Sequence, residues 1–251
     1  MRVKGLVREG SCSLDWVGWL AHVGLQLLKS GAAHPTVMVK EGYSYGLPLV
    51  LIGGGLLGFG FFWPGKFFFF AAAFFLILAL FVLNFFRDPD RSVPAGVGVL
   101  VSPADGRVVE IRPEEAAGRS LQRISIFMSP FNVHVNRSPV AGSIESVVYR
   151  KGSFRMASEP RASVENECNT FTVGGENGEV IVRQIAGVLA RRIVFWKNVG
   201  DHVERGERVG MIKFGSRVDI LVSPEVALSV KVGDHVKAGS TIIGTCRSNS
   251  S

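Results

Sequence analysis

The chain has 251 residues, of which 47% are hydrophobic, and its 28 Lys and Arg residues outnumber its 21 Asp and Glu residues, giving a formal net charge of +7. Such a balance suits nucleic acid or an anionic membrane surface, but no basic run with interleaved aromatic residues occurs, which argues against nucleic acid. The three cysteines are far apart and form no cluster with histidine, so the sequence indicates neither a disulfide framework nor a metal site.

Residues 1–46 are interpreted as an N-terminal leader. The first residues are basic, as in a signal peptide, but Asp15 and His22 interrupt the apolar stretch that should follow them. Met38 is an alternative translation start, and in that case the protein would yield no intact peptide from residues 1–37.

Residues 47–86 predict a transmembrane helical hairpin. The run 67–86 is rich in Phe, Leu and Ala, and at about 1.5 Å per residue it spans about 30 Å, the thickness of a bilayer core. The run 47–62 is short for a span and holds five glycines, which favour close helix packing; a re-entrant segment is the alternative for this run. Basic residues flank the outer ends of the hairpin more than its connector, so the positive-inside rule places both termini in the cytoplasm.

Residues 87–251 predict a mostly β catalytic domain, because short β-rich runs alternate with Gly, Pro, Asp and Asn. Residues 185–195 could form either a helix or a further strand. The other predicted strands are 106–111, 124–128, 133–135, 144–149, 170–173 and 180–185.

This domain contains an internal repeat. Residues 199–203 and 232–236 share the sequence Val-Gly-Asp-His-Val, and a glycine follows three residues after each. The repeat resembles the turns of biotinyl- and lipoyl-type β-sandwich domains, and the Ser-Pro segments at Ser102 and Ser138 resemble strand openings of the same kind. The predicted fold class is therefore α+β, mostly β: an interleaved β-sandwich of two such units, preceded by the helical hairpin.

Gly215 and Ser216 lie between two apolar runs, which predicts a strand, a tight turn and a second strand. Glycine tolerates strained backbone, and the Ser216 hydroxyl follows the Gly215 carbonyl, which it could attack if a base took its proton. Taken alone, Gly-Ser is an ordinary turn dipeptide.

Asp105 and His134 are candidates for the acid and base of such a reaction. Asp105 lies in Pro-Ala-Asp-Gly, which by itself is a turn sequence. His134 lies in the alternating segment 131–135, where a histidine could equally be a core or surface residue, although neutral imidazole is the usual general base near pH 7. His202 and His235 belong to the repeated turn and are interpreted as structural.

Several separated segments together resemble the phosphatidylserine decarboxylase proenzymes, in the same order and at approximately the same spacing. The chain is similar to the short bacterial and archaeal-type branch of that family over roughly residues 43–246. The segments are Phe85–Arg91, Ser102–Arg107, Phe131–Arg137, Glu165–Thr170, Gln184–Arg192 and Phe214–Arg217.

The resemblance implies that Asp105, His134 and Ser216 form a triad whose target is the chain itself. Ser216 would attack the Gly215 carbonyl, β-elimination would break the resulting ester, and hydration with loss of ammonia would leave a pyruvoyl group at position 216. The products would be a β chain that ends at Gly215 and an α chain that begins at position 216.

The pyruvoyl group derived from Ser216 is the cofactor that the resemblance implies. It would form a Schiff base with the substrate amine and accept the electrons left by the departing CO₂. The implied reaction converts phosphatidylserine in the cell membrane to phosphatidylethanolamine, with the catalytic domain on the cytoplasmic side. The implied assembly is a heterodimer of the protein's own α and β chains, which could dimerise further, with no nucleic acid and no metal.

This sequence departs from the longer members of the family near His134. They carry a second histidine three residues before the triad histidine, where this chain has Phe131. A role for that histidine in protonating the carbanion does not carry over, and His134 could serve twice. Phe131 could instead act as an apolar wall that favours loss of charge from a carboxylate. Arg217, where longer members have Thr, is counted as a feature of the branch.

Two other functions stay open on the residues alone. A membrane-anchored biotinyl- or lipoyl-like carrier or adaptor would fit the helix and sandwich, but Met-Ile-Lys213-Phe is not the Met-Lys-Met sequence of biotinylated turns, and no heptad run predicts an adaptor's coiled coil. A soluble amino-acid decarboxylase with a pyruvoyl group is the other, and the hydrophobic hairpin argues against a soluble substrate.

Overall fold

The computed structural model describes residues 38–63, 65–116, 118–153, 165–176, 178–187, 192–213 and 216–246. The predicted leader before Met38 and the residue Gly215 lie outside these ranges. The described helices are α2 (Lys40–Phe62) and α3 (Lys66–Phe85). The strands are β1 (Val99–Val101), β2 (Gly106–Ala116), β3 (Arg119–Met128), β4 (Val135–Arg137), β5 (Gly142–Arg150), β6 (Cys168–Gly175), β7 (Gly178–Ala186), β8 (Arg192–Phe195), β9 (His202–Val203), β10 (Arg208–Lys213), β11 (Ser216–Val222), β12 (Ala227–Leu228), β13 (His235–Val236) and β14 (Ile242–Thr245). The predicted class, a mostly β domain preceded by two apolar helices, is confirmed.

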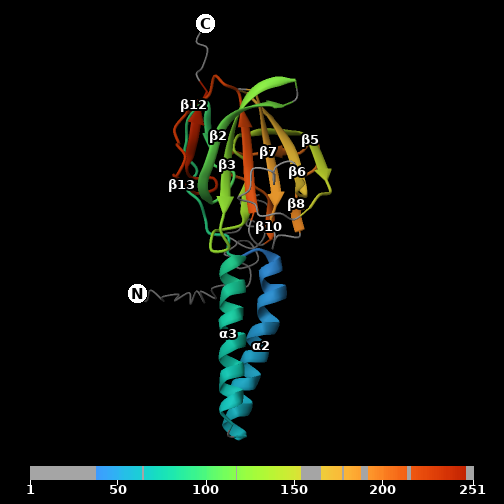
Figure 1. Ribbon diagram of the computed structural model, residues 1–251, viewed down its shortest axis with the longest axis vertical. Coiled ribbons are helices and arrows are strands. Elements are labelled where there is room, and N and C mark those ends of the chain that lie inside the picture. The colour runs from blue at the N-terminus through green and yellow to red at the C-terminus, as the bar shows by residue number, and fades with distance from the viewer. Residues whose placement is uncertain are drawn as a thin grey trace, which may run out of the picture. The chain divides into compact units, whose positions relative to one another are not determined.

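Helices α2 and α3 lie side by side as a hairpin (Figure 1). α2 begins at Lys40 rather than at the predicted residue 47, because the more polar stretch 40–46 continues the same helix. Every described residue of α2 that is buried is a glycine. A Cβ added at Gly46 would lie 2.4 Å from a side-chain carbon of Leu83 on α3, so the glycine face lets the two backbones approach closely, as the sequence predicted.

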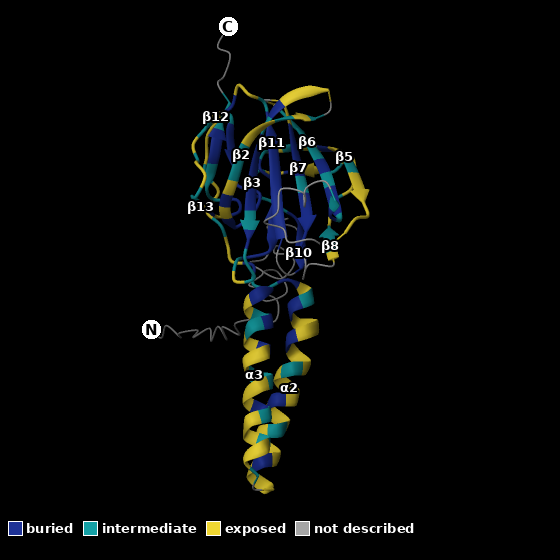
Figure 2. Cartoon of the chain, viewed as in Figure 1, coloured by how far each residue is buried: buried dark blue, intermediate teal, exposed yellow. Residues whose placement is uncertain are grey.

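The outward faces of the hairpin are exposed and apolar (Figure 2). Phe62, Phe67 and Phe70 are 88%, 75% and 75% exposed. Both helices are long and apolar enough to cross a membrane. Because a continuous apolar surface of this kind is unfavourable in water, the hairpin suggests association with a membrane.

The described strands form one large sheet and two small ones. The large sheet has the order β13-β2-β3-β11-β7-β6-β5-β9, and the small sheets have the orders β1-β14-β12 and β4-β10-β8. β11 lies at the centre of the large sheet, antiparallel to β3 on one edge and to β7 on the other (Figure 1). Every residue of β11 is buried, and Val218 and Ile220 belong to the main hydrophobic core.

The repeat in the sequence is also a repeat in the structure. The Asp-His-Val turn of one copy places β13 beside β2, and the other turn places β9 beside β5. The backbone hydrogen bonds correspond as well, since the amides of Gly239 and Gly206 donate to the carbonyls of Ser102 and Ser138, each at 2.8 Å. The strand order of the large sheet is symmetric about its centre, since β13 corresponds to β9, β2 to β5, β3 to β6 and β11 to β7.

One copy of the repeat is inserted into the other. β1–β3 together with β11–β14 form the first copy, and β4–β10, which lie between β3 and β11 in the chain, form the second. In the second copy β6 and β7 join at a short hairpin where Gly175 pairs with Gly178. The corresponding pair in the first copy is Met128 and Ser216. The predicted interleaving therefore takes the form of an insertion at a hairpin tip. Ser216 is the first strand residue of the first copy after the inserted second copy.

Three local predictions have definite outcomes. His134 does not lie in a strand, because Asn132 folds the preceding residues into a turn: its side-chain oxygen accepts from the Ser129 amide at 2.8 Å. The strands before and after residues 214–215 exist as predicted, but β10 belongs to a small sheet and β11 to the large one. In the region 185–195 the described residues end β7 and form β8, which selects the strand interpretation.

A buried cluster of charges clamps β11 to its neighbours on the face opposite Ser216. The Arg217 guanidinium donates to Asp219 at 2.7 Å, to the Ser125 hydroxyl at 2.6 Å and to Glu110 at 3.1 Å. Arg217 and Asp219 are 1% and 0% exposed. A buried ion pair adds modestly to stability as a whole, but removing one partner leaves the other charge buried and uncompensated.

Replacing Arg217 with Met should therefore lower the free energy of unfolding by about 3–5 kcal/mol at pH 7. The matched control is Arg119→Met, which removes a surface pair with Glu179 whose side chains are 52% and 40% exposed, and which should cost no more than about 1 kcal/mol. Denaturant titration of both variants in detergent micelles measures the difference. Equal losses for the two variants would show that the cluster does not clamp β11.

Candidate active site

Ser216 is the first residue of β11 and is fully buried. Its backbone lies opposite Met128 of β3 and Ala186 of β7, so pairing on both edges fixes its position. Its hydroxyl lies 3.3 Å from the sulfur of Met128. A thioether is a weak acceptor. The hydroxyl is therefore enclosed by the protein but forms no strong hydrogen bond with the described residues.

His134 lies between the Asn132 turn and β4, and its side chain is buried. Its Nδ1 lies 2.9 Å from the Asn132 carbonyl oxygen. A carbonyl can only accept, so Nδ1 must carry the proton, which leaves the lone pair on Nε2. Nε2 is buried and has no hydrogen-bond partner among the described residues. The ring also packs against Phe85 of α3, with ring centroids 4.0 Å apart.

The surroundings of His134 keep its imidazole neutral. Burial removes the water that would stabilise the imidazolium, and together with the Arg87 charge it lowers the pKa of His134 to about 4, although the Asn132 hydrogen bond opposes the shift. A neutral ring with a buried, unpaired Nε2 is in the protonation state that a general base requires.

Asp105 is held by groups other than His134. Arg91 donates to both carboxylate oxygens, at 2.9 and 3.0 Å, and the Ala238 amide donates to Oδ1 at 2.7 Å. No hydrogen bond joins Asp105 to His134 in the described structure; the Asn132 carbonyl occupies the Nδ1 side of the ring instead. The triad that the resemblance implies stays a prediction, with its acid and base positioned separately.

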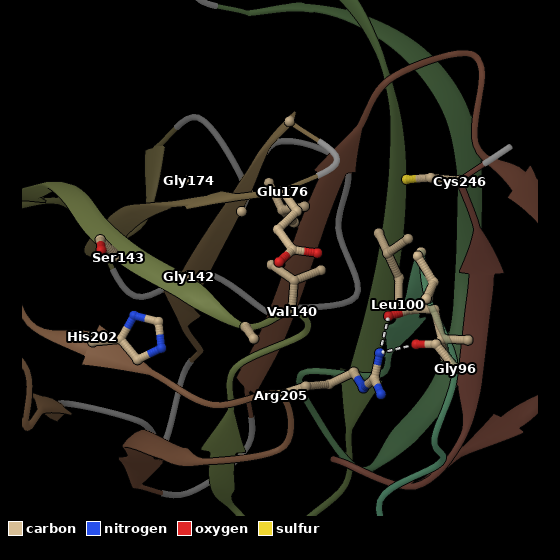
Figure 3. Close-up of a pocket in the computed structure, with 17 residues that line it drawn as sticks. Gly96, Leu100, Val140, Gly142, Ser143, Gly174, Glu176, His202, Arg205 and Cys246 are labelled. Carbon is tan, nitrogen blue, oxygen red and sulfur yellow. Dashed lines mark hydrogen bonds between the residues drawn. The ribbon is translucent and has the colours of Figure 1, made fainter. Parts of the chain in front are cut away.

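The repeat gives each of the three predicted residues a counterpart in the second copy. The matched strand registers and backbone hydrogen bonds pair Asp105 with Ala141, His134 with Gly98, and Ser216 with Gly178. Ala141, Gly98 and Gly178 all line one cavity of about 530 Å³ (Figure 3). By this correspondence Asp105, His134 and Ser216 occupy the matching positions of the first copy, and their grouping around the point of insertion stays a prediction.

A buried polar network that sequence reasoning missed lies beside Ser216. Asn169 donates to Gln184, and Gln184 donates to Asn136, each at 2.9 Å. Asn136 in turn lies 3.9 Å from the sulfur of Met128, the atom that faces the Ser216 hydroxyl. The sequence did carry a signal for this network, namely a polar residue at an inward-facing strand position within a motif. Amide side chains at such positions are buried, and buried amides occur where they are fully hydrogen-bonded.

The end of the hairpin contacts the segment that carries His134. Arg87, which follows α3, donates to the Phe131 carbonyl at 2.7 Å. The Phe131 ring packs edge-on against Phe81 of α3, with centroids 6.2 Å apart, and is otherwise 69% exposed. Phe131 therefore lies against α3 rather than inside a closed pocket.

Comparison with known proteins identifies relatives along most of the chain. A family model described as phosphatidylserine decarboxylase matches residues 78–244. The chain is 55% identical to a phosphatidylserine decarboxylase proenzyme of Solibacter usitatus over 168 residues, which cover 67% of this chain and 80% of that protein. It is 43% identical to the proenzyme of Geobacter metallireducens over 212 residues, which cover 83% of this chain and 96% of that protein.

The low pKa of His134 predicts a specific acid sensitivity. In the unfolded chain the imidazole binds a proton near pH 6.5, whereas in the folded protein it does so only near pH 4, so stability is fully present above pH 6.5 and falls as the pH drops between these values. In the uncut Ser216→Ala protein, moving from pH 7 to pH 4.5 should cost about 2–3 kcal/mol through His134. Denaturant titrations at both pH values, with and without a second change His134→Phe, isolate this contribution. A contribution of the opposite sign would mean that the folded protein favours the imidazolium.

Proposed function

The chain belongs to the phosphatidylserine decarboxylase family and is a decarboxylase, and on that premise we propose that it converts phosphatidylserine to phosphatidylethanolamine with a pyruvoyl group made from its own Ser216. The observation that carries the proposal is the state of Ser216, which is buried at the start of β11 and whose hydroxyl has the weak Met128 thioether as its one hydrogen-bond partner among the described residues. Such a serine needs a base, and the one we propose is His134 Nε2, which is buried and has no hydrogen-bond partner among the described residues.

Self-cleavage is the first proposed reaction. His134 Nε2 takes the Ser216 proton while the hydroxyl oxygen attacks the Gly215 carbonyl, so the peptide bond becomes an ester and the Ser216 nitrogen becomes an amine. Loss of the α proton then expels the Gly215 carboxylate and leaves dehydroalanine. Addition of water and release of ammonia convert this residue to pyruvoyl. Asp105 would act through the electrostatic field at the site, since the Asn132 carbonyl already orients the imidazole.

Decarboxylation is the second proposed reaction. The pyruvoyl group, when present at position 216, supplies a carbonyl that binds the substrate amine and takes up the electrons of the broken carbon–carboxylate bond. The chain's own residues enclose that group between β3 and β7 and exclude water from it. Because Phe131 stands where longer members of the family have a second histidine, another group must return a proton to the product carbon. We propose His134 for this role, which it could fill only after taking up a proton during the reaction, since its imidazole is otherwise neutral.

The two products of cleavage should stay associated. β11 to β14 belong to the α chain, yet β11 pairs with β3 and β7, and β13 and β14 pair with β2 and β1. The proposed heterodimer of α and β chains is therefore held by the sheet itself. The rival function of a biotinyl-like carrier needs an exposed lysine at a turn, whereas Lys213 is only 7% exposed.

Cleavage and the roles of the three residues can be tested together. Wild-type protein should separate into two chains on a denaturing gel, split between Gly215 and Ser216, and should elute as one particle under native conditions. The small chain should resist Edman sequencing because its N-terminus is a keto acyl group. Ser216→Ala should stay whole and inactive.

The base and the acid should differ in a maturation time course. His134→Ala should accumulate as a full-length chain, because it removes the base that we propose takes the serine proton. Asp105→Asn should slow cutting, by as much as ~10⁴-fold on the protease precedent, yet still cut over hours because maturation happens once per molecule. The control is His202→Ala, an exposed histidine of the repeated turn, which should mature normally. Normal maturation of His134→Ala would remove His134 as the base.

The proposed location is the cell membrane, with the catalytic domain in the cytoplasm. Lys40, Arg87 and Arg91 flank the outer ends of the hairpin, while Lys66 alone lies at its connector. A reporter fused after Ser251 should therefore be cytoplasmic in character. Alkaline phosphatase activity from that fusion, together with an inactive green fluorescent protein fusion, would place the domain on the other side.

A further inference from the structure

A second cavity, distinct from that of Figure 3, lies where the helical hairpin meets the end of β10. It has a volume of about 480 Å³. Its walls are formed mainly by apolar side chains of α2 and α3 and the residue after α3, and its one basic side chain is that of Lys213. The residues that line it are Ser44, Tyr45, Pro48, Leu49, Leu78, Val82, Phe86 and Lys213.

Lys213 is an unusual lysine because it is 93% buried, its exposure being 7%. Its ammonium lies over the rings of Tyr45 and Phe86, 5.3 and 5.8 Å from their centroids. Among the described residues no carboxylate forms an ion pair with it. Cation–π contacts offset only part of the cost of burying a cation, and a buried charge is normally paired with one of opposite sign. The cavity therefore presents a positive charge that an anion would complete.

We infer, on the basis of the proposed function, that Lys213 binds the phosphodiester of the phospholipid substrate, with the glycerol and acyl end in the apolar part of this cavity. In the protein, the reacting residue Ser216 is preceded by Lys213 three positions earlier, and the cavity beyond Lys213 is lined by α2 and α3. In the substrate, the reacting amine is followed by the phosphate and then by the glycerol and acyl chains. Ser216, Lys213 and the cavity would therefore face the amine, the phosphate and the acyl end in the same order.

The competing anion on the substrate is the carboxylate that is lost, and its chemistry argues against it as the partner of Lys213. Decarboxylation removes the negative charge of that group as CO₂ leaves. A cation paired with it would stabilise the ground state more than the transition state and would slow the reaction. A phosphodiester keeps its charge throughout, so a lysine bound to it helps binding without opposing the chemistry.

Three variants test this assignment: Lys213→Gln, Lys213→Arg and the control Lys231→Gln, which changes an exposed lysine. Cut enzyme is first confirmed by mass, and decarboxylation is then measured against the surface concentration of phosphatidylserine in neutral detergent micelles. Lys213→Gln should lower kcat/KM by about 10- to 100-fold, mainly through KM, whereas Lys213→Arg and Lys231→Gln should stay within about threefold of wild type. A serine alkyl ester, which has no phosphate, should be decarboxylated equally by wild type and by Lys213→Gln. Equal losses on both substrates would overturn the assignment.

A binding measurement decides the question even for a variant that does not mature. Short-chain phosphatidylserine is titrated by calorimetry into uncut Ser216→Ala protein in neutral micelles, with and without Lys213→Gln. Affinity should fall by about 10- to 100-fold with Lys213→Gln, and unchanged affinity would sink the inference. If the proposed function itself were wrong, the result would be different: the wild-type protein would be neither cut nor active.

Discussion

The pairing of β11 on both edges is the constraint on which the rest of the molecule depends. β11 lies between β3 and β7, every one of its residues is buried, and Arg217 and Asp219 tie it to its neighbours on the face opposite Ser216. A strand held in this way does not need a covalent bond at its N-terminus to keep its place. The chain passes from a small sheet to the large one between Lys213 and Ser216, and the bond proposed to break immediately precedes Ser216, the first paired residue of β11. Cleavage there would remove continuity of the chain and leave the sheet intact.

The internal repeat separates what the fold requires from what the chemistry requires. Both copies have a Ser-Pro opening, a Gly-Asp-His turn and the same bulge positions in their strands. They differ at three matched positions, where one copy has Asp105, His134 and Ser216 and the other has Ala141, Gly98 and Gly178. The second tip shows that this architecture forms without an acid, an imidazole or a hydroxyl. Asp105 has structural contacts of its own with Arg91 and the Ala238 amide, so the comparison applies best to His134 and Ser216, whose side chains the repeated fold does not require.

Sequence patterns predicted the elements whose signals are local. The apolar runs predicted α2 and α3, alternation predicted most of the strands, and the repeated turns predicted two related units. The network of Asn136, Gln184 and Asn169 was not predictable in this way, because it depends on which strands become neighbours and in which register. The burial of Lys213 against Tyr45 and the engagement of Asp105 by Arg91 are likewise contacts between segments far apart in the sequence. His134 was misplaced in a strand because its alternating neighbours outweighed the turn that Asn132 makes with Ser129.

The contact between α3 and the His134 segment links the apolar helical hairpin to the candidate active site. Phe85 packs on the imidazole, and the burial that this packing contributes lowers the pKa of His134 and keeps the ring neutral. The same apolar surroundings favour a reaction in which a carboxylate charge disappears, since the loss of charge is easier where water is excluded. A helical hairpin that only anchored the protein would not need to touch His134. Its last turn does, so the hairpin contributes to the electrostatic environment of this histidine.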